Sequence, residues 1–132
     1  MKIESEKLRR FCIDAMLEHG MSEKDAETTA DVLVTTDLWG TKTHGTKQLR
    51  LLLRNAREGG LRLDTQPEVI ADGPAYALVD GNFAMPMVTA TTAMGLAIEK
   101  AATAGVGYVG VRRSSHFGAA GYYANMAAAR NM

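Results

Sequence analysis

The spacing of apolar and polar residues predicts that the first part of the chain folds as helices. Between residues 5 and 20, apolar side chains recur at i, i+3, i+4, i+7 and i+8, which is the pattern of a helix with one buried face. These positions are Leu8, Phe11, Cys12, Ala15 and Met16. Ser5 is placed to cap the start of this helix, and Gly20 is placed to end it.

Two further helices are predicted before residue 61. Ser22 and Asp25 form a capping pattern at the start of the second helix, which ends at Gly40. A third helix follows the polar turn at 41–46 and stops at the glycine pair 59–60. Its inward face consists of Leu49, Leu52, Leu53 and Ala56.

The second part of the chain alternates between strand and helix patterns. Short apolar runs at 68–71 and 75–80, separated by a turn, predict a β-hairpin. Pro86 is placed in the first turn of a long, mostly apolar helix that reaches about residue 104. A strand at 106–111 and a helix at 119–129 follow. The predicted fold class is therefore α+β, with an N-terminal helical bundle, a β-hairpin, a long helix and then a strand–turn–helix unit.

The amino-acid composition argues against some classes of binding partner. Hydrophobic residues make up 46% of the 132-residue chain and charged residues 23%, which is ordinary for a soluble globular domain. Fifteen Lys and Arg balance 15 Asp and Glu, so no basic excess indicates nucleic acid or an anionic membrane as a partner. The single cysteine, Cys12, excludes an internal disulfide, fits a reducing compartment and falls on a predicted buried face. We therefore expect a cytoplasmic protein without nucleic-acid or membrane partners.

Two histidines occupy similar polar turns, and these turns hold the candidate chemistry. His44 lies between Thr43 and a glycine, and His116 follows Ser115 in the turn between a predicted strand and a helix. An imidazole titrates near neutral pH and can transfer a proton, and two of them suit coupled acid–base and orienting roles. Gly118 allows close backbone approach, and the free amides of the next helix offer a place for a carboxylate.

Other interpretations of the two turns are less informative but stay open. Both rings can simply cap backbone amides or face water. A metal site is not predicted, because the two histidines have no carboxylate or thiol partner at ligand spacing. The sequence also has neither a G-x-G-x-x-G pattern nor a P-loop pattern, so no phosphate-binding loop is predicted.

Three segments of the chain resemble one protein family. They are T-H-G at 43–45, V-D-G at 79–81 and S-S-H-F-G-A-A-G-Y-Y at 114–123. These segments are similar to the malate/L-lactate dehydrogenase family of NAD(P)-dependent 2-hydroxyacid and 2-ketoacid oxidoreductases, which is separate from the Rossmann-type lactate and malate dehydrogenases. The resemblance implies NAD or NADP as cofactor, a small 2-hydroxy or 2-keto acid as substrate, and a homodimer with its active site near the subunit interface.

The resemblance also implies roles for individual residues. His116 matches a histidine that accepts or donates the proton on the substrate oxygen, and His44 matches a substrate-pocket histidine that is the acid–base group in some members. Which of the two moves the proton stays open. Ser115 is expected to orient His116 or to bind substrate, and Thr43 stands where the family usually has serine. Gln48 stands where the family's S-H-G-x-x-R pattern has an arginine for the substrate carboxylate, and glutamine supplies no charge there.

The length of the chain affects whether it is expected to be active by itself. Members of the family run to several hundred residues, so residues 1–132 resemble an N-terminal substrate-binding and dimerisation portion without a complete cofactor site. No cofactor-binding residue is assigned, and we expect the chain to be inactive by itself. The competing hypothesis is a catalytically silent α+β module whose long apolar helix serves oligomerisation.

Overall fold

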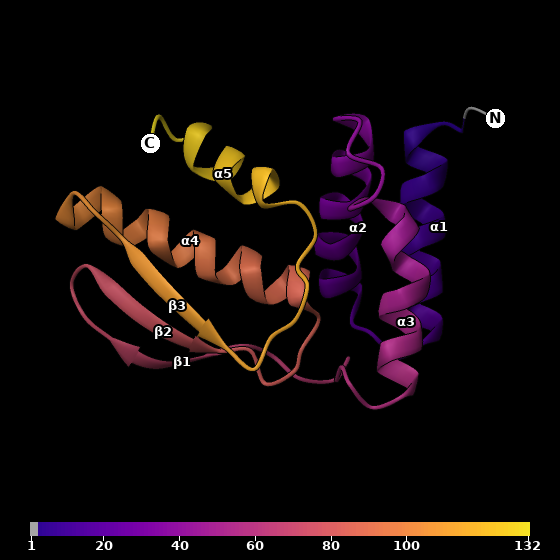
Figure 1. Cartoon of the computed structure of the whole chain (residues 1–132), viewed down its shortest axis with the longest axis horizontal. Helices are drawn as coiled ribbons and strands as arrows, with labels where there is room; N and C mark the ends of the chain where they lie inside the picture. The colour runs from indigo at the N-terminus through magenta and orange to yellow at the C-terminus, as the bar shows by residue number, and fades with distance from the viewer. Residues whose placement is uncertain (1–2) are drawn as a thin grey trace.

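Three helices at the start of the chain pack together beside a small sheet (Figure 1). The computed structural model describes residues 3–132. The helices are α1 (Ser5–Glu18), α2 (Glu23–Leu38) and α3 (Leu49–Arg57), and a short 3-10 turn at Thr46–Gln48 leads into α3. Leucine, alanine and methionine side chains of these helices belong to the buried hydrophobic core. The predicted helical bundle is confirmed.

Local signals explain where most of these helices begin and end. Ser22 Oγ accepts a hydrogen bond from the Asp25 amide at 3.2 Å, so the predicted cap of α2 is confirmed. The predicted Ser5 cap of α1 is wrong, because Glu4 is the extended residue before the helix and Ser5 already lies inside the first turn. Phe11 was also expected on the buried face, yet its side chain is 63% exposed. The buried stripe runs through Cys12, and Phe11 is turned about 100° away from it around the helix.

The sheet has the order β1-β2-β3. Strands β1 (Glu68–Asp72) and β2 (Tyr76–Asp80) form the predicted antiparallel hairpin, and β3 (Tyr108–Arg112) lies parallel to β2. The last strand begins two residues later than predicted. A Cβ on Gly107 would lie 2.0 Å from the Ala97 carbonyl oxygen, so residues 106–107 are needed for the close return of the chain past the preceding helix.

The long helix α4 (Pro86–Ala104) joins the bundle to the sheet. It lies between the sheet and α5 (Ala120–Ala128), and its first turns contact α2 (Figure 1). Met87 is fully buried in the cluster that also contains Leu33 of α2, while Val79 of β2 is buried in the sheet. Pro86 occupies the first turn, and Gly105 ends the helix with a φ of 81°, as predicted. None of the helices in residues 3–132 is long and apolar enough to cross a membrane.

The polar turn after α2 is held by a carboxylate at the end of that helix. Asp37 Oδ2 accepts hydrogen bonds from the Thr46 amide at 3.0 Å and the Thr46 hydroxyl at 2.5 Å. Gly45 lies directly against this carboxylate, because a Cβ at position 45 would be 2.0 Å from Asp37 Oδ1. The turn that contains His44 is therefore fixed to α2 through Asp37.

A second carboxylate lies at the end of β2. The Asp80 residue is 1% exposed, and its oxygens accept hydrogen bonds from the side chains of Arg112 and Arg113. The hydrogen bonds from Arg113 hold the pKa of Asp80 well below its ordinary value, with further lowering by the Asn82 amide and Arg112, against the opposing effect of burial. Asp80 therefore ties the end of β2 to the end of β3 in its ionised form.

Substitution of Gly45 by alanine tests the close contact with Asp37. The added methyl group must displace the Asp37 carboxylate and its hydrogen bonds to Thr46, so we expect a loss of about 1–3 kcal/mol in the free energy of unfolding. Urea denaturation measures this loss. The matched control is Gly95→Ala in α4, where a Cβ meets no atom within 4 Å and a gain of up to about 1 kcal/mol is expected. Equal stabilities of the two variants would contradict the assigned contact.

The lowered pKa of Asp80 predicts a specific acid sensitivity. Because this pKa is depressed on folding, the stabilisation is fully present above the ordinary Asp value of about 3.9 and is lost as pH falls below it. Asp80→Asn, which cannot titrate at this position, should lose less stability over the same pH interval in urea denaturation. The exposed Asp64 provides the control, since Asp64→Asn should keep the wild-type slope. A wild-type slope in Asp80→Asn would refute the assignment.

Candidate functional site

The fold brings the two predicted histidine turns together. His44 comes from the turn after α2, and His116 from the loop between β3 and α5, yet their ring centroids are 5.2 Å apart with the planes tilted by 31°. His44 is half-buried and His116 is exposed. Two imidazoles at this separation can hydrogen-bond to one small molecule that lies at their edges.

The His44 ring is held by its own turn. The Thr43 hydroxyl lies 2.9 Å from His44 Nδ1, within hydrogen-bond distance, and Gln48 Nε2 donates to the Thr43 carbonyl oxygen at 2.6 Å. Gln48 therefore braces the backbone next to His44, and one hydrogen of its amide group is already used. A glutamine amide has a second hydrogen for another acceptor, but no charge.

The His116 ring folds back over the residues that follow it. The Gly118 amide donates to His116 Nδ1 at 3.2 Å. Gly118 has a φ of 84°, a conformation that favours glycine. A Cβ there would lie 3.5 Å from Val32 Cγ1 and 3.7 Å from the His44 carbonyl oxygen, so the backbone at Gly118 packs against both α2 and the other histidine turn. This close approach was predicted at Gly118.

The start of α5 presents backbone amides near this loop. Its N-cap is Ala119, and no side chain caps the first turn. An uncapped helix start favours an anion. The predicted role in carboxylate binding stays a prediction.

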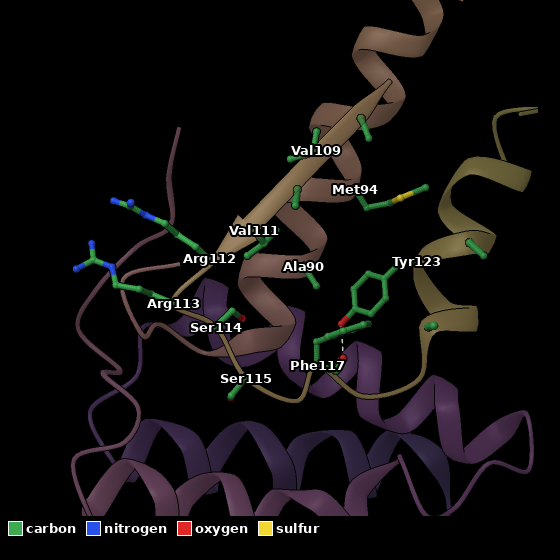
Figure 2. Close-up of a pocket in the computed structure, with 14 residues that line it drawn as sticks. Ala90, Met94, Val109, Val111, Arg112, Arg113, Ser114, Ser115, Phe117 and Tyr123 are labelled. Carbon is green, nitrogen blue, oxygen red and sulfur yellow. Dashed lines mark hydrogen bonds between the residues drawn. The ribbon is translucent and has the colours of Figure 1, made fainter. Parts of the chain in front are cut away.

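A cavity that sequence reasoning missed lies next to the His116 loop. It has a volume of about 680 Å³ and lies between α4, β3 and α5 (Figure 2). Ser114 and Ser115 line one end, and on the side of α5 the Tyr123 hydroxyl donates to the Phe117 carbonyl oxygen at 2.6 Å (Figure 2). The walls are mostly apolar: Ala90, Ala93, Met94, Ala97, Val109 and Val111. The run of alanines along the long helix was the available signal, because small side chains leave space beside a helix.

The cavity has both apolar and polar lining residues. Its apolar walls suit a flat aromatic ring, and the serine hydroxyls are suitable polar partners for such a ring. Arg112 and Arg113 also line the cavity, and both donate to Asp80, Arg113 through Nε and Nη2 and Arg112 through Nε alone. The expectation that the chain lacks a complete cofactor site stays a prediction.

Two other features limit the chemistry of this part of the chain. Within residues 3–132, no group of three or more His, Cys, Asp or Glu side chains is arranged to hold a metal ion. Cys12 is fully buried, as predicted. Burial, and next the charge of Asp37, raise the pKa of the Cys12 thiol to about 11, so it stays protonated and unreactive at neutral pH.

Comparison with known proteins gives a consistent result. The sequence profile described as malate/L-lactate dehydrogenase matches residues 3–132. A malate dehydrogenase of Pyrococcus abyssi is 40% identical over 132 residues, which cover 100% of this chain and 36% of that protein. An L-sulfolactate dehydrogenase of Methanocaldococcus jannaschii is 35% identical and is covered over 38% of its length. The structure of malate dehydrogenase from Pyrococcus horikoshii OT3 superposes with a TM-score of 0.96 at 39% identity, covering 100% of this chain and 38% of that one.

The chain thus spans less than two fifths of the length of these relatives and corresponds to their N-terminal portion. The helical bundle, the hairpin and the two histidine turns all lie within the matched residues. This chain belongs to the malate/L-lactate dehydrogenase family.

Proposed function

We propose that this chain forms the substrate-binding and acid–base portion of an NAD(P)-dependent oxidoreductase that acts on a small 2-hydroxy or 2-keto acid. The observation that carries the proposal is the 5.2 Å separation of the His44 and His116 rings. Oxidation of a hydroxy acid requires removal of the hydroxyl proton, and an imidazole at its edge is suited to that step. The relatives named for malate and sulfolactate both act on a carbon that bears a hydroxyl group beside a carboxylate.

The hydrogen bonds of the two rings favour different roles. His116 Nδ1 accepts from the Gly118 amide, so a neutral His116 has its proton on Nε2 and presents a donor to the substrate oxygen. When His44 Nδ1 donates to the Thr43 hydroxyl, its Nε2 keeps a lone pair and can accept the substrate proton. We therefore propose that His44 moves the proton and that His116 holds and polarises the oxygen.

The substrate carboxylate needs its own partners. Gln48 has a free amide hydrogen beside the Thr43 turn, and the uncapped start of α5 offers backbone amides beyond Gly118. Ser115 lies at the cavity end of the His116 loop. We propose that these groups, with the Thr43 hydroxyl, bind the acid without a bidentate cation. Weak carboxylate binding is the expected consequence.

The cofactor and the second subunit belong to the same proposal. NAD or NADP is implied by the family resemblance, and residues 3–132 offer it a mostly apolar cavity that Arg112 and Arg113 also line. We propose that residues 1–132 alone do not turn over substrate. A homodimer is supported by the exposed apolar side chains of Phe11 on α1 and of Leu38 and Trp39 at the end of α2, since such side chains are typical of an interface.

Histidine substitutions test the assigned roles. We suggest a chimera in which this chain replaces the matching N-terminal portion of the Pyrococcus horikoshii malate dehydrogenase. His44→Gln should lower kcat for a 2-hydroxy acid by about 10²–10⁴, because no base is left for the proton. His116→Gln keeps a hydrogen-bond donor and should lose less. The kcat of each variant is measured from the change in nicotinamide absorbance.

The control for these variants is His19→Gln, since His19 lies at the end of α1 and contacts the Ala15 carbonyl oxygen. It should leave kcat unchanged. A larger loss in His116→Gln than in His44→Gln would reverse the two roles. Full activity in both variants would refute the proposed chemistry and favour the silent oligomerisation module.

Restoring a cation tests the role of position 48. In the same chimera, Gln48→Arg should lower KM for the acid by about tenfold or more, because a charge-assisted bidentate hydrogen bond contributes about 1.5–3 kcal/mol. The neighbouring Lys47→Arg variant is the control, since Lys47 is already a cation and lies exposed. An unchanged KM in a folded Gln48→Arg variant would place the carboxylate elsewhere.

A further inference from the structure

The V-D-G segment at 79–81 has no part in the chemistry described so far, yet its aspartate is the most heavily hydrogen-bonded carboxylate of the described residues. Asp80 Oδ1 accepts from Arg113 Nε at 2.7 Å and from the Asn82 amide at 2.9 Å. Asp80 Oδ2 accepts from Arg113 Nη2 at 2.7 Å and Arg112 Nε at 2.8 Å. Arg113 thus binds both carboxylate oxygens through Nε and Nη2 of its guanidinium, whereas Arg112 binds one oxygen.

The backbone beside Asp80 is built around the same contact. The Gly81 amide donates to the Arg112 carbonyl oxygen at 2.8 Å, and the Phe83 amide donates to the Arg113 carbonyl oxygen at 3.0 Å. A Cβ at Gly81 would lie 2.8 Å from the Arg113 oxygen, so only glycine fits this approach. The segment after β2 therefore continues to pair with the chain at the point where β3 ends.

Arg113 is the residue at which the strand turns into the His116 loop. Its φ is 49°, a left-handed conformation that a residue with a side chain rarely adopts. Such a conformation persists where surrounding contacts determine it. Here those contacts are the bidentate hydrogen bonds to Asp80 and a third bond from Nη2 to Asn82 Oδ1 at 2.7 Å.

The far end of the loop is held separately. The Tyr123 hydroxyl donates to the Phe117 carbonyl oxygen at 2.6 Å, and the two rings lie edge to face at 5.4 Å. Tyr123 is buried, and burial raises the pKa of its phenol, so it stays a donor. His116 therefore lies in a short loop with one polar tether at Arg113 and another at Phe117.

We propose that Asp80 is a positioning residue for His116. It acts through the bidentate hydrogen bonds from Arg113, which set the direction of the loop that contains His116. Its significance for catalysis rests on the proposed function, in which His116 holds the substrate oxygen. The structural part of the inference does not depend on that function. Removal of the Arg113 side chain should release the His116 ring from the Gly118 amide and from His44. Removal of Arg112, which contacts the same carboxylate from the strand, should not.

The pair Arg113→Ala and Arg112→Ala tests this in the 132-residue chain itself. Both variants remove one cation from Asp80, so they share the loss of charge and differ in the tether of the loop. NMR of ¹⁵N-labelled histidine reports the tautomer of His116, and cross-peaks between the His44 and His116 ring protons report their contact. We expect Arg113→Ala to lose the fixed tautomer and the cross-peaks, and Arg112→Ala to keep both.

Two results would overturn the proposal. One is a folded Arg113→Ala chain with the wild-type His116 tautomer and cross-peaks; the other is an equal loss of both signals in Arg112→Ala. If Arg113→Ala does not fold, Arg113→Lys provides the same test, because one ammonium cannot bridge both Asp80 oxygens in the fork geometry of arginine. Weaker His116–His44 cross-peaks are then expected, and unchanged ones contradict the proposal. The NMR readout needs no turnover, so its failure is separate from failure of the proposed activity.

Discussion

The contact between α2 and the first turn of α4 is the constraint on which the rest of the fold depends. Met87 of α4 is buried in the same cluster as Val32 and Leu33 of α2, and each fully buried side chain of this size contributes about 1.5–3 kcal/mol. Gly118 lies over this contact, since a Cβ there would be 3.6 Å from Met87 Cε. The helical bundle and α4 therefore meet where the two histidine turns meet.

Three carboxylates hold the segments around this apolar contact in place. Asp37 holds the turn of His44 to α2, and Asp80 holds the start of the His116 loop to β2. Both carboxylates lie at the end of a regular element. Asp37 accepts hydrogen bonds from Thr46 in the following turn, and Asp80 accepts them from Arg113, which is distant in sequence. A third carboxylate, Asp31, accepts from Arg9 Nη1 at 2.7 Å and from the Tyr122 hydroxyl, which ties α5 to the bundle. The site is thus assembled by tertiary contacts on rigid elements.

The sequence predicted the features that depend on local chemistry. The Ser22 cap, the proline start and glycine end of the long helix, and the hairpin follow from rules that act over a few residues. The two histidine turns were also found this way, together with Gly118. The burial of Phe11 was predicted wrongly. The apolar stripe of a helix does not reveal which side of that stripe the neighbouring helices cover.

The parts that could not be predicted depend on contacts between separate elements. The roles of Asp37 and Asp80 depend on hydrogen bonds to Thr46 and to Arg113, and nothing in the local pattern distinguishes these carboxylates from exposed ones. The cavity depends on how α4, β3 and α5 are spaced, which alanine-rich composition alone does not determine. The 5.2 Å separation of the two rings likewise results from tertiary packing between segments distant in sequence.

The most direct test of the account is a ligand titration of the two rings. L-malate added to the ¹⁵N-histidine-labelled chain should shift the His44 and His116 signals together, with one common Kd, while His19 at the end of α1 stays unshifted. A common Kd means that one small acid lies against both imidazoles. Separate Kd values, or a response confined to one of the two rings, would contradict a shared site.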